Sequence, residues 1–424
     1  MFGIEDGFDI VIGNPPYFSL STDSEWRDTN GRRLKHNQIY APCGFETFVR
    51  AGDIYCLFYE RGWQLLKANG HLCYITSNKW MRAGYGEATR KFFAEKTDPQ
   101  LLIDFAGEKI FESATVDTNI LLFEKNSQNR GETLCCIGTS DCRKDLSVFV
   151  KQTATPCAFT SSESWVILSP IEQSIKRKIE SVGTPLKDWN IQINYGIKTG
   201  CNEAFIIDEV KRSEILANCR DAVERKRTEQ IIRPILRGRD IKRYGYDWAG
   251  LYLIATHNGM PEKGIKRIDI ENYPSIKRHL DAYWDKISSR SDKGDTPYNL
   301  RSCAYMDDFA KPKIVWGNLS LNASFAKAPS GMFINAPCVM ITPFSDYLLA
   351  VLNSKLGDWY IRQLGVTRNG GYFEYKPMFV EQLPVPQTAT FISNDADVYA
   401  LYGLTDAEIS FLENNEKRLS SSGQ

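Results

Sequence analysis

Short apolar runs alternate with amphipathic stretches across the first 125 residues. Apolar residues recur at helical spacing over 53–67 and again over 86–96. The short apolar runs, which favour strands, occupy residues 8–13, 72–76, 101–105 and 119–124. Strands that alternate with helices imply crossover connections, so this pattern predicts an α/β fold with a mostly parallel sheet.

The first predicted strand ends in a polar and aromatic tip, Asn14-Pro15-Pro16-Tyr17. Open α/β sheets place their binding sites beyond the carboxyl ends of strands. The amide oxygen of Asn14 and the carbonyl of Pro15 can accept two hydrogen bonds from one exocyclic amino group of a substrate. The Tyr17 ring can stack on the planar base that carries this group. Pro15 and Pro16 hold the turn extended. The tip therefore suits a planar substrate with an amino group, and a plain strand-ending turn is the alternative.

Residues 18–45 are polar and aromatic, with Gly31, Pro42 and Gly44 and little periodicity. This pattern predicts a long loop over the tip. Long loops inside compact domains usually carry function, so we expect a substrate-side lid or a DNA-contacting loop here.

Positive charge is concentrated in the middle of a chain whose net charge is zero. Residues 1–150 hold 17 Lys and Arg against 20 Asp and Glu, whereas residues 211–313 hold 22 against 15. The second region is a candidate footprint for a polyanion such as nucleic acid. A solvated basic surface without a partner is the alternative.

The candidate DNA contacts in this region are basic side chains interleaved with Tyr244, Tyr246 and Trp248, a mixture that suits phosphate contact and base stacking. They are Arg233, Arg237, Arg239, Lys242 and Arg243. The alternative is that the stretch around Gly238 forms a turn whose charges pair with Asp240 and Asp247.

Composition indicates a soluble protein. The chain has 424 residues, 42% hydrophobic and 25% charged, and no apolar run approaches the roughly 20 residues that cross a bilayer. No signal segment follows Met1, so a cytoplasmic location is expected. The 11 cysteines are scattered without a Cys-x-x-Cys pair, and we therefore expect reduced thiols and no metal site.

The order of elements resembles the second half of a DNA adenine-N6 methyltransferase of the NPPY class. The matching features are the tip, the helix at 53–67, the strand that follows Gly70, and the segment 105–111 before a final strand. The resemblance implies that the tip grips the amino group of a flipped adenine. It also implies that Phe111 stacks on the face of the base opposite Tyr17, although Phe111 could equally be a core residue.

The cofactor that this resemblance implies is S-adenosylmethionine. On the helix at 53–67, Asp53 and Phe58 are the candidate contacts, with a core position as the alternative for Phe58. Enzymes of this class also use a glycine-rich loop and an acidic residue that come before the tip, and these are absent here. We therefore expect a partial Rossmann-like methyltransferase sheet that represents only the second half of the catalytic domain.

The later part of the chain resembles the TaqI-like C-terminal specificity domain of type IIG and IIS restriction-modification enzymes. Five ordered segments carry the resemblance: 231–244, 315–318, 352–355, 369–373 and 381–386. We expect a methyltransferase half over 1–150, a linker at 153–164, a mixed α/β target-recognition domain over 165–390, and a terminal helix and tail over 395–424. Thr405 and Glu408 form a predicted capping box for that helix.

Together these resemblances predict part of a sequence-specific DNA adenine-N6 methyltransferase that acts on double-stranded DNA and is inactive as this chain alone. The expected partner is the N-terminal methyltransferase half, with a nuclease domain where the parent protein cleaves DNA. Asp104, Glu108 and Lys109 lack the spacing of a nuclease motif. The alternatives are a DNA-binding specificity module without catalysis and a methyltransferase that acts on protein glutamine.

Overall fold

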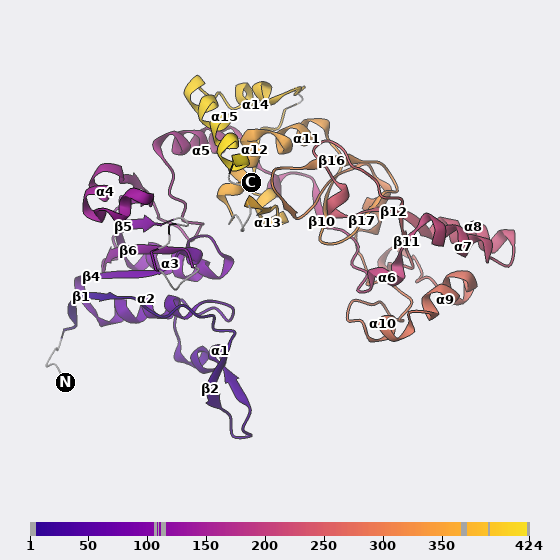
Figure 1. The fold of residues 1–424 in the computed structure, drawn as a ribbon, viewed down its shortest axis with the longest axis horizontal. Coiled ribbons are helices and arrows are strands. Elements are labelled where there is room, and N and C mark those ends of the chain that lie inside the picture. Colours follow the sequence, from indigo (N-terminus) through magenta and orange to yellow (C-terminus); the bar gives the residue numbers. More distant parts are fainter. Residues whose placement is uncertain are drawn as a thin grey trace. The chain divides into compact units, whose positions relative to one another are not determined.

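The computed structural model describes residues 6–105, 108, 110–111, 116–365, 371–388 and 391–421, with side chains as far as residue 414. The chain divides into two compact units, Met1–Ser174 and Ile175–Gln424. Figure 1 traces the chain through both units.

A six-stranded mixed sheet forms the centre of the N-terminal unit. Its strands, in spatial order, are β1 (Phe8–Gly13), β4 (Leu66–Ser77), β6 (Thr118–Glu124), β5 (Asp98–Asp104), β7 (Thr133–Ile137) and β8 (Thr155–Cys157). Only β1 with β4 and β5 with β7 run parallel. The α/β class is confirmed, but the mostly parallel sheet is not. Strand β6 instead pairs antiparallel with both of its neighbours.

Helices cover the two faces of this sheet unequally. On one face, α2 (Ile54–Leu65) and α3 (Glu87–Lys96) enclose a core that includes Tyr59, Phe93 and Phe123. On the other face, α4 (Leu146–Thr153) packs Phe149 against Ile103 of β5. The alternation of side chains along each strand thus serves two separate cores.

The second face is uncovered at β1. Ile10 and Ile12 are 67% and 78% exposed, and Phe8 is 37% exposed on the same side of the strand. The intervening Val11 packs into the core under α2. Among the described strands, β1 pairs with β4 alone, so its other edge is open.

Two segments differ from their predicted structure. Residues 18–45 contain a hairpin, β2 (Asp23–Arg27) with β3 (Arg33–Lys35), followed by α1 (His36–Tyr40) and a 3₁₀ turn (Ala41–Cys43). The prediction of a loop was wrong because charged residues hid the alternation of the two short strands. The segment 153–164 is not a linker, since it contributes β8 and Phe159, which stacks on Trp165 at 4.5 Å within the core.

The C-terminal unit contains two four-stranded sheets. The first has the order β10 (Gln192–Tyr195), β18 (Val339–Thr342), β14 (Lys313–Trp316), β16 (Phe325–Ala328), and the second β11 (Ile206–Asp208), β13 (Leu251–Ile254), β12 (Ile232–Leu236), β17 (Phe333–Ile334). Phe309 stacks on Phe333 at 4.5 Å in their shared core. The helices of this part of the chain are α5 (Pro170–Val182), α6 (Asn202–Phe205), α7 (Glu209–Ala217), α8 (Ala222–Ile231), α9 (Pro274–Asp281) and α10 (Trp284–Ser289). Strands and helices are thus mixed in the C-terminal unit, as predicted for the target-recognition domain.

Two consecutive helices follow β18, α11 (Asp346–Asn353) and α12 (Lys355–Gln363). Ser354 is extended between them, and its hydroxyl accepts a hydrogen bond from Gly357 N at 3.0 Å. The side chain of Asn353 instead bonds both backbone groups of Phe325 at 2.9 Å. The two polar residues therefore end one helix and begin the next.

Short elements complete the C-terminal unit. The small strands are β9 (Thr184–Pro185) with β20 (Pro384–Val385), and β15 (Leu319–Ser320) with β19 (Phe373–Glu374). The last helices are α13 (Pro377–Val380), α14 (Asp395–Leu401) and α15 (Asp406–Ser421). The capping box before α15 is confirmed, since Thr405 N donates to Glu408 Oε2 at 2.7 Å and Glu408 N to Thr405 Oγ1 at 3.4 Å. No helix in the described ranges has the length and apolar character to cross a bilayer.

Candidate active site

The tip Asn14–Tyr17 continues β1 beyond the end of its pairing with β4. Gly13 permits a close approach there, because a Cβ on this residue would lie 3.2 Å from the Tyr74 ring. Pro15 is buried, while Asn14 and Pro16 are exposed. The tip therefore presents the Asn14 amide to solvent from a fixed backbone.

The hydroxyl of Tyr17 fixes the position of the Asn14 side chain. It lies 2.6 Å from Asn14 Oδ1 and 3.0 Å from the carbonyl oxygen of Ile75. Burial raises the pKa of Tyr17, so the hydroxyl keeps its proton at neutral pH and acts as a donor. The Tyr17 side chain thus connects the tip to β4 and also holds the side-chain amide of Asn14 in place. Sequence reasoning gave no signal for the Ile75 contact, because the acceptor is a backbone carbonyl that any residue would provide.

A group of hydroxyls and one carboxylate lies beneath the Tyr17 ring. Tyr17 meets Tyr55 edge-on at 6.2 Å. Asp53 Oδ2 accepts hydrogen bonds from Tyr55 at 3.0 Å and from Tyr85 at 2.7 Å. Burial raises the pKa of both Tyr55 and Tyr85, which therefore remain donors. Sequence analysis found Asp53 but missed Tyr85, which lies between two glycines outside any predicted motif.

Phe58 is 40% exposed on α2, whereas its neighbours Leu57 and Tyr59 are buried. It is therefore not a core residue of the N-terminal unit, and the alternative of a simple core position is wrong. An exposed ring on a rigid helix is suited to stacking on a planar ligand.

Other strand ends meet at the sheet edge that carries the tip. Asn78, just after β4, donates from Nδ2 to Asp104 Oδ1 at 2.8 Å and from its backbone N to Asp117 O at 3.0 Å. Phe111 is half-buried in the connection between β5 and β6. Residues 112–115, which adjoin it, lie outside the described residues, as does Lys109.

Two of the five predicted DNA contacts, Arg233 and Arg237, are half-buried. Arg237 donates to both carboxylate oxygens of Asp240, from Nε at 3.0 Å and from Nη2 at 2.8 Å. This bidentate pair holds the pKa of Arg237 above its ordinary value. Arg233 is half-buried in β12 beside Gly331. The turn that we considered as the alternative therefore exists at Arg237 and Asp240, whereas Asp247 joins it only through a backbone bond to Asp240.

The remaining three, Arg239, Lys242 and Arg243, are exposed. Lys242 Nζ donates to the carbonyl of Arg239 at 2.9 Å, and Arg243 Nη2 donates to the carbonyl of Asn353 at the same distance. Arg243 also lies 5.4 Å from the ring of Tyr244, which is half exposed and adopts a positive φ of 67°. Cations and an aromatic ring thus share one exposed turn.

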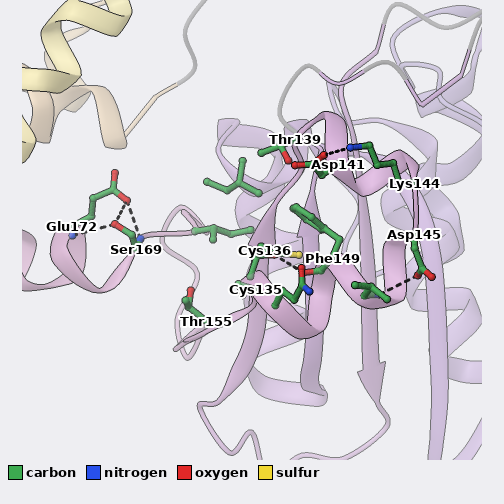
Figure 2. A pocket seen from close by; sticks show the side chains of 15 residues that line it. Cys135, Cys136, Thr139, Asp141, Lys144, Asp145, Phe149, Thr155, Ser169 and Glu172 are labelled. Atoms are coloured by element: carbon green, nitrogen blue, oxygen red, sulfur yellow. Dashed lines mark hydrogen bonds and ion pairs between the residues drawn. The ribbon is translucent and has the colours of Figure 1, made fainter.

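A separate cavity of about 600 Å³ lies between β7, α4 and the segment before α5 (Figure 2). Its floor includes Cys135, Cys136 and Phe149, and Asp141 and Lys144 pair at 2.8 Å on its rim. None of the tip residues lines this cavity. Within the described ranges, no group of three His, Cys, Asp or Glu side chains could hold a metal ion.

Comparison with known proteins assigns both parts of the chain. Residues 1–111 match the Eco57I restriction-modification methylase family, and residues 233–385 match the TaqI-like C-terminal specificity domain. The Type II methyltransferase M.PaeR7I of Pseudomonas aeruginosa is 22% identical over 97% of this chain and 73% of its own length. The restriction enzyme and methyltransferase RM.Eco57I of Escherichia coli is 27% identical over 89% of this chain and 40% of its own.

One solved structure supports the fold. The Type IIL restriction-modification enzyme MmeI, determined in complex with DNA, superposes with a TM-score of 0.56 at 11% identity over 97% of this chain. The chain spans 57% of MmeI and less than half of RM.Eco57I. The chain therefore carries one segment that matches the Eco57I restriction-modification methylase family and a later segment that matches the TaqI-like C-terminal specificity domain.

Proposed function

We propose that this chain provides the base-binding half and the target-recognition domain of a DNA adenine-N6 methyltransferase in a restriction-modification enzyme. The observation that carries the proposal is the tip, where Tyr17 holds the Asn14 amide just beyond the carboxyl end of β1. The specificity domain in the same chain supports DNA as the substrate. It argues against a protein-glutamine substrate, which needs no DNA reader.

The tip would bind the amino group of the target adenine. Asn14 Oδ1 has two lone pairs, so the bond from Tyr17 leaves one for an amino hydrogen, and the Pro15 carbonyl would accept the other. Two acceptors on one amino group hold the nitrogen in place and polarise its N–H bonds, which raises the availability of the nitrogen lone pair as it approaches the methyl group in line. The acceleration would then come mainly from positioning, with the proton leaving after methyl transfer.

The adenine ring would be held between Tyr17 and Phe111. Removing a base from the duplex breaks its stacking and pairing, and two aromatic faces replace part of that stabilisation. Tyr17 supports this role because its ring is fixed edge-on against Tyr55.

S-adenosylmethionine, when bound, supplies an electrophilic methyl group. In this chain, Phe58 would stack on its adenine ring and Asp53 would accept a hydrogen bond from its polar groups. The remaining contacts would belong to the other half of the catalytic domain. The exposed Ile10 and Ile12 and the open edge of β1 support such a completing polypeptide, because natural sheets rarely leave an apolar edge strand uncovered.

Contact with the DNA backbone would come from the basic turn of the C-terminal unit. Arg239, Lys242 and Arg243 are exposed and suit phosphate contacts. Arg237, which is committed to Asp240, would shape the turn and position its neighbours, and Arg233 would support it from β12.

Methyl transfer to duplex DNA tests the proposal. Incorporation of a labelled methyl group would be measured with the chain alone and with the chain combined with an N-terminal methyltransferase half. Asn14→Ala should reduce transfer at least a hundredfold and leave DNA affinity within about twofold, since the amide acts on the base after binding. Gln128→Ala, an exposed amide in the loop after β6, is the control.

Unchanged methylation by Asn14→Ala contradicts the assignment of the tip. A label that appears on protein and not on DNA favours the glutamine alternative. DNA binding without transfer in any combination favours a specificity module without catalysis.

A further inference from the structure

The hairpin β2–β3 projects from the N-terminal unit a few residues after the tip. Figure 1 shows β2 extending away from the central sheet. Backbone hydrogen bonds anchor its base, from Leu20 N to Gly52 O at 2.8 Å and from Asn37 N to Leu20 O at 2.7 Å. The hairpin is therefore fixed against the start of α2, beside the residues that hold Tyr17.

The outer half of the hairpin carries more positive than negative charge. Arg27 and Arg33 stand directly opposite each other across the two strands, and Arg32 is exposed between them in the chain. None of the three pairs with a carboxylate of the described residues. Asp28, the acidic residue of this half, accepts hydrogen bonds from Asn30 N and Arg32 N and is committed to the turn. Like charges directly opposite on a two-stranded ribbon are destabilising, so this arrangement favours a bound anion.

The same hairpin exposes a large aromatic side chain. Trp26 is 72% exposed on β2, whereas Trp80, Trp165 and Trp316 are buried. Because the exposed Trp26 ring buries little apolar surface, a contribution to folding does not explain its position on the hairpin. Indole rings stack on bases, and apolar side chains act as wedges between base steps.

We propose that the hairpin, residues 23–35, is a DNA-contacting arm of the active site. Arg27, Arg32 and Arg33 contact phosphates, and Trp26 packs against bases next to the target nucleotide. The short tether of the hairpin to Tyr17 places these contacts on the DNA that flanks the extruded base. This inference rests on the proposed function for its partner, duplex DNA.

The salt dependence of DNA binding tests the arginines without knowledge of the target sequence. Affinity of the full chain for a fluorescein-labelled duplex of random sequence would be measured by anisotropy over a range of salt concentrations. Arg32→Ala/Arg33→Ala should lower the slope of log affinity against log salt by roughly 2, because each phosphate contact contributes about 0.9. The charge-matched control Arg61→Ala/Lys91→Ala removes exposed cations from α2 and α3 and should leave the slope unchanged.

Trp26→Ala tests the base contact. It should weaken binding by roughly tenfold with an unchanged salt slope, since stacking involves no counterion release. Phe391→Ala, which removes an aromatic ring that is 82% exposed, is the matched control and should bind as the wild type does. Both positions are exposed, so unchanged circular dichroism should accompany each variant.

Wild-type slope and affinity in the hairpin variants overturn the inference, whatever the methylation assay shows. Loss of binding in these variants, together with failure of the chain to methylate DNA in any combination, upholds the arm and overturns the proposed function. The two failures are thus distinguishable.

Discussion

The hydroxyl of Tyr17 stands 2.6 Å from the amide oxygen of Asn14, so the aromatic residue of the tip also orients its polar residue. Tyr17→Phe keeps the ring but removes this hydrogen bond. We expect methyl transfer by the active enzyme to fall about threefold to tenfold, the equivalent of one hydrogen bond of roughly 1 kcal/mol. Steady-state kinetics should show the loss in kcat rather than in KM for DNA.

Tyr17→Ala is the companion variant, since it removes the ring as well as the hydroxyl. It should lose far more activity than Tyr17→Phe because stacking on the base is also lost. Equal activities for the two variants would contradict the stacking role, and full activity in Tyr17→Phe would contradict the positioning role.

Gly86 allows α3 to begin directly against the turn after β4. A Cβ on Gly86 would lie 1.9 Å from the carbonyl oxygen of Trp80, which also accepts a hydrogen bond from Arg90 Nη1. Gly86→Ala should therefore destabilise the N-terminal unit by about 1–3 kcal/mol through overpacking. Gly84→Ala is the matched control, because nothing lies within 4 Å of its Cβ position. Urea denaturation of both variants measures the difference, and equal midpoints would contradict the steric account.

The elements that position the tip, and one helix cap in the C-terminal unit, could be predicted from local sequence. The strand before Asn14, the helix after Asp53 and the capping box at Thr405 each follow from short-range patterns, and the structure contains all three. The roles of the tip residues stay a prediction, because geometry alone does not test them.

The other features of the fold and the site depend on tertiary contacts, which the periodicity of the sequence does not reveal. The antiparallel direction of β6 is set by its pairing with β4 and β5, and the break at Ser354 follows from the hydrogen bonds that Asn353 makes to Phe325. Charged residues concealed the β2–β3 hairpin, although the turn around Gly31 offered a signal. The carboxylate of Asp240 claims Arg237, a pairing that the sequence allowed but did not require.

Lys313 is fully buried in β14, and its ammonium group donates to three backbone carbonyls. Phe309 O, Met332 O and Pro329 O lie 3.0, 3.1 and 3.2 Å from Nζ. Burial lowers the pKa of Lys313 to about 8. Between that value and the ordinary lysine value, the unfolded chain binds the extra proton, so stability rises with pH.

The stability of the wild type relative to Lys313→Met should therefore increase by about 1 kcal/mol between pH 7 and pH 9. The comparison with the variant cancels the titration of other tyrosines, cysteines and lysines. Urea denaturation at the two pH values measures it. A stability difference that stays constant or falls with pH would show that the lysine remains charged in the fold.

Arg362 on α12 compensates a buried carboxylate. Its Nε lies 3.1 and 3.2 Å from the two oxygens of Asp358, and Tyr375 OH donates to the same carboxylate. Burial raises the pKa of Asp358, and the guanidinium of Arg362 opposes this rise. Arg362→Ala leaves the charge buried without its partner, so we expect a loss of about 3–5 kcal/mol in the free energy of unfolding.

The loss should grow with pH. Without Arg362, the pKa of Asp358 in the folded protein rises further. Asp358 then binds a proton in the native state that the unfolded chain has already released. The free energy of unfolding therefore falls as pH rises above the ordinary carboxyl range. Arg362→Ala should thus be more destabilised, relative to the wild type, at pH 8 than at pH 5. Tyr375→Phe, which removes one neutral donor and keeps the ring, should lose only about 1 kcal/mol with little pH dependence. Equal losses for the two variants at both pH values would contradict a charged role for Arg362.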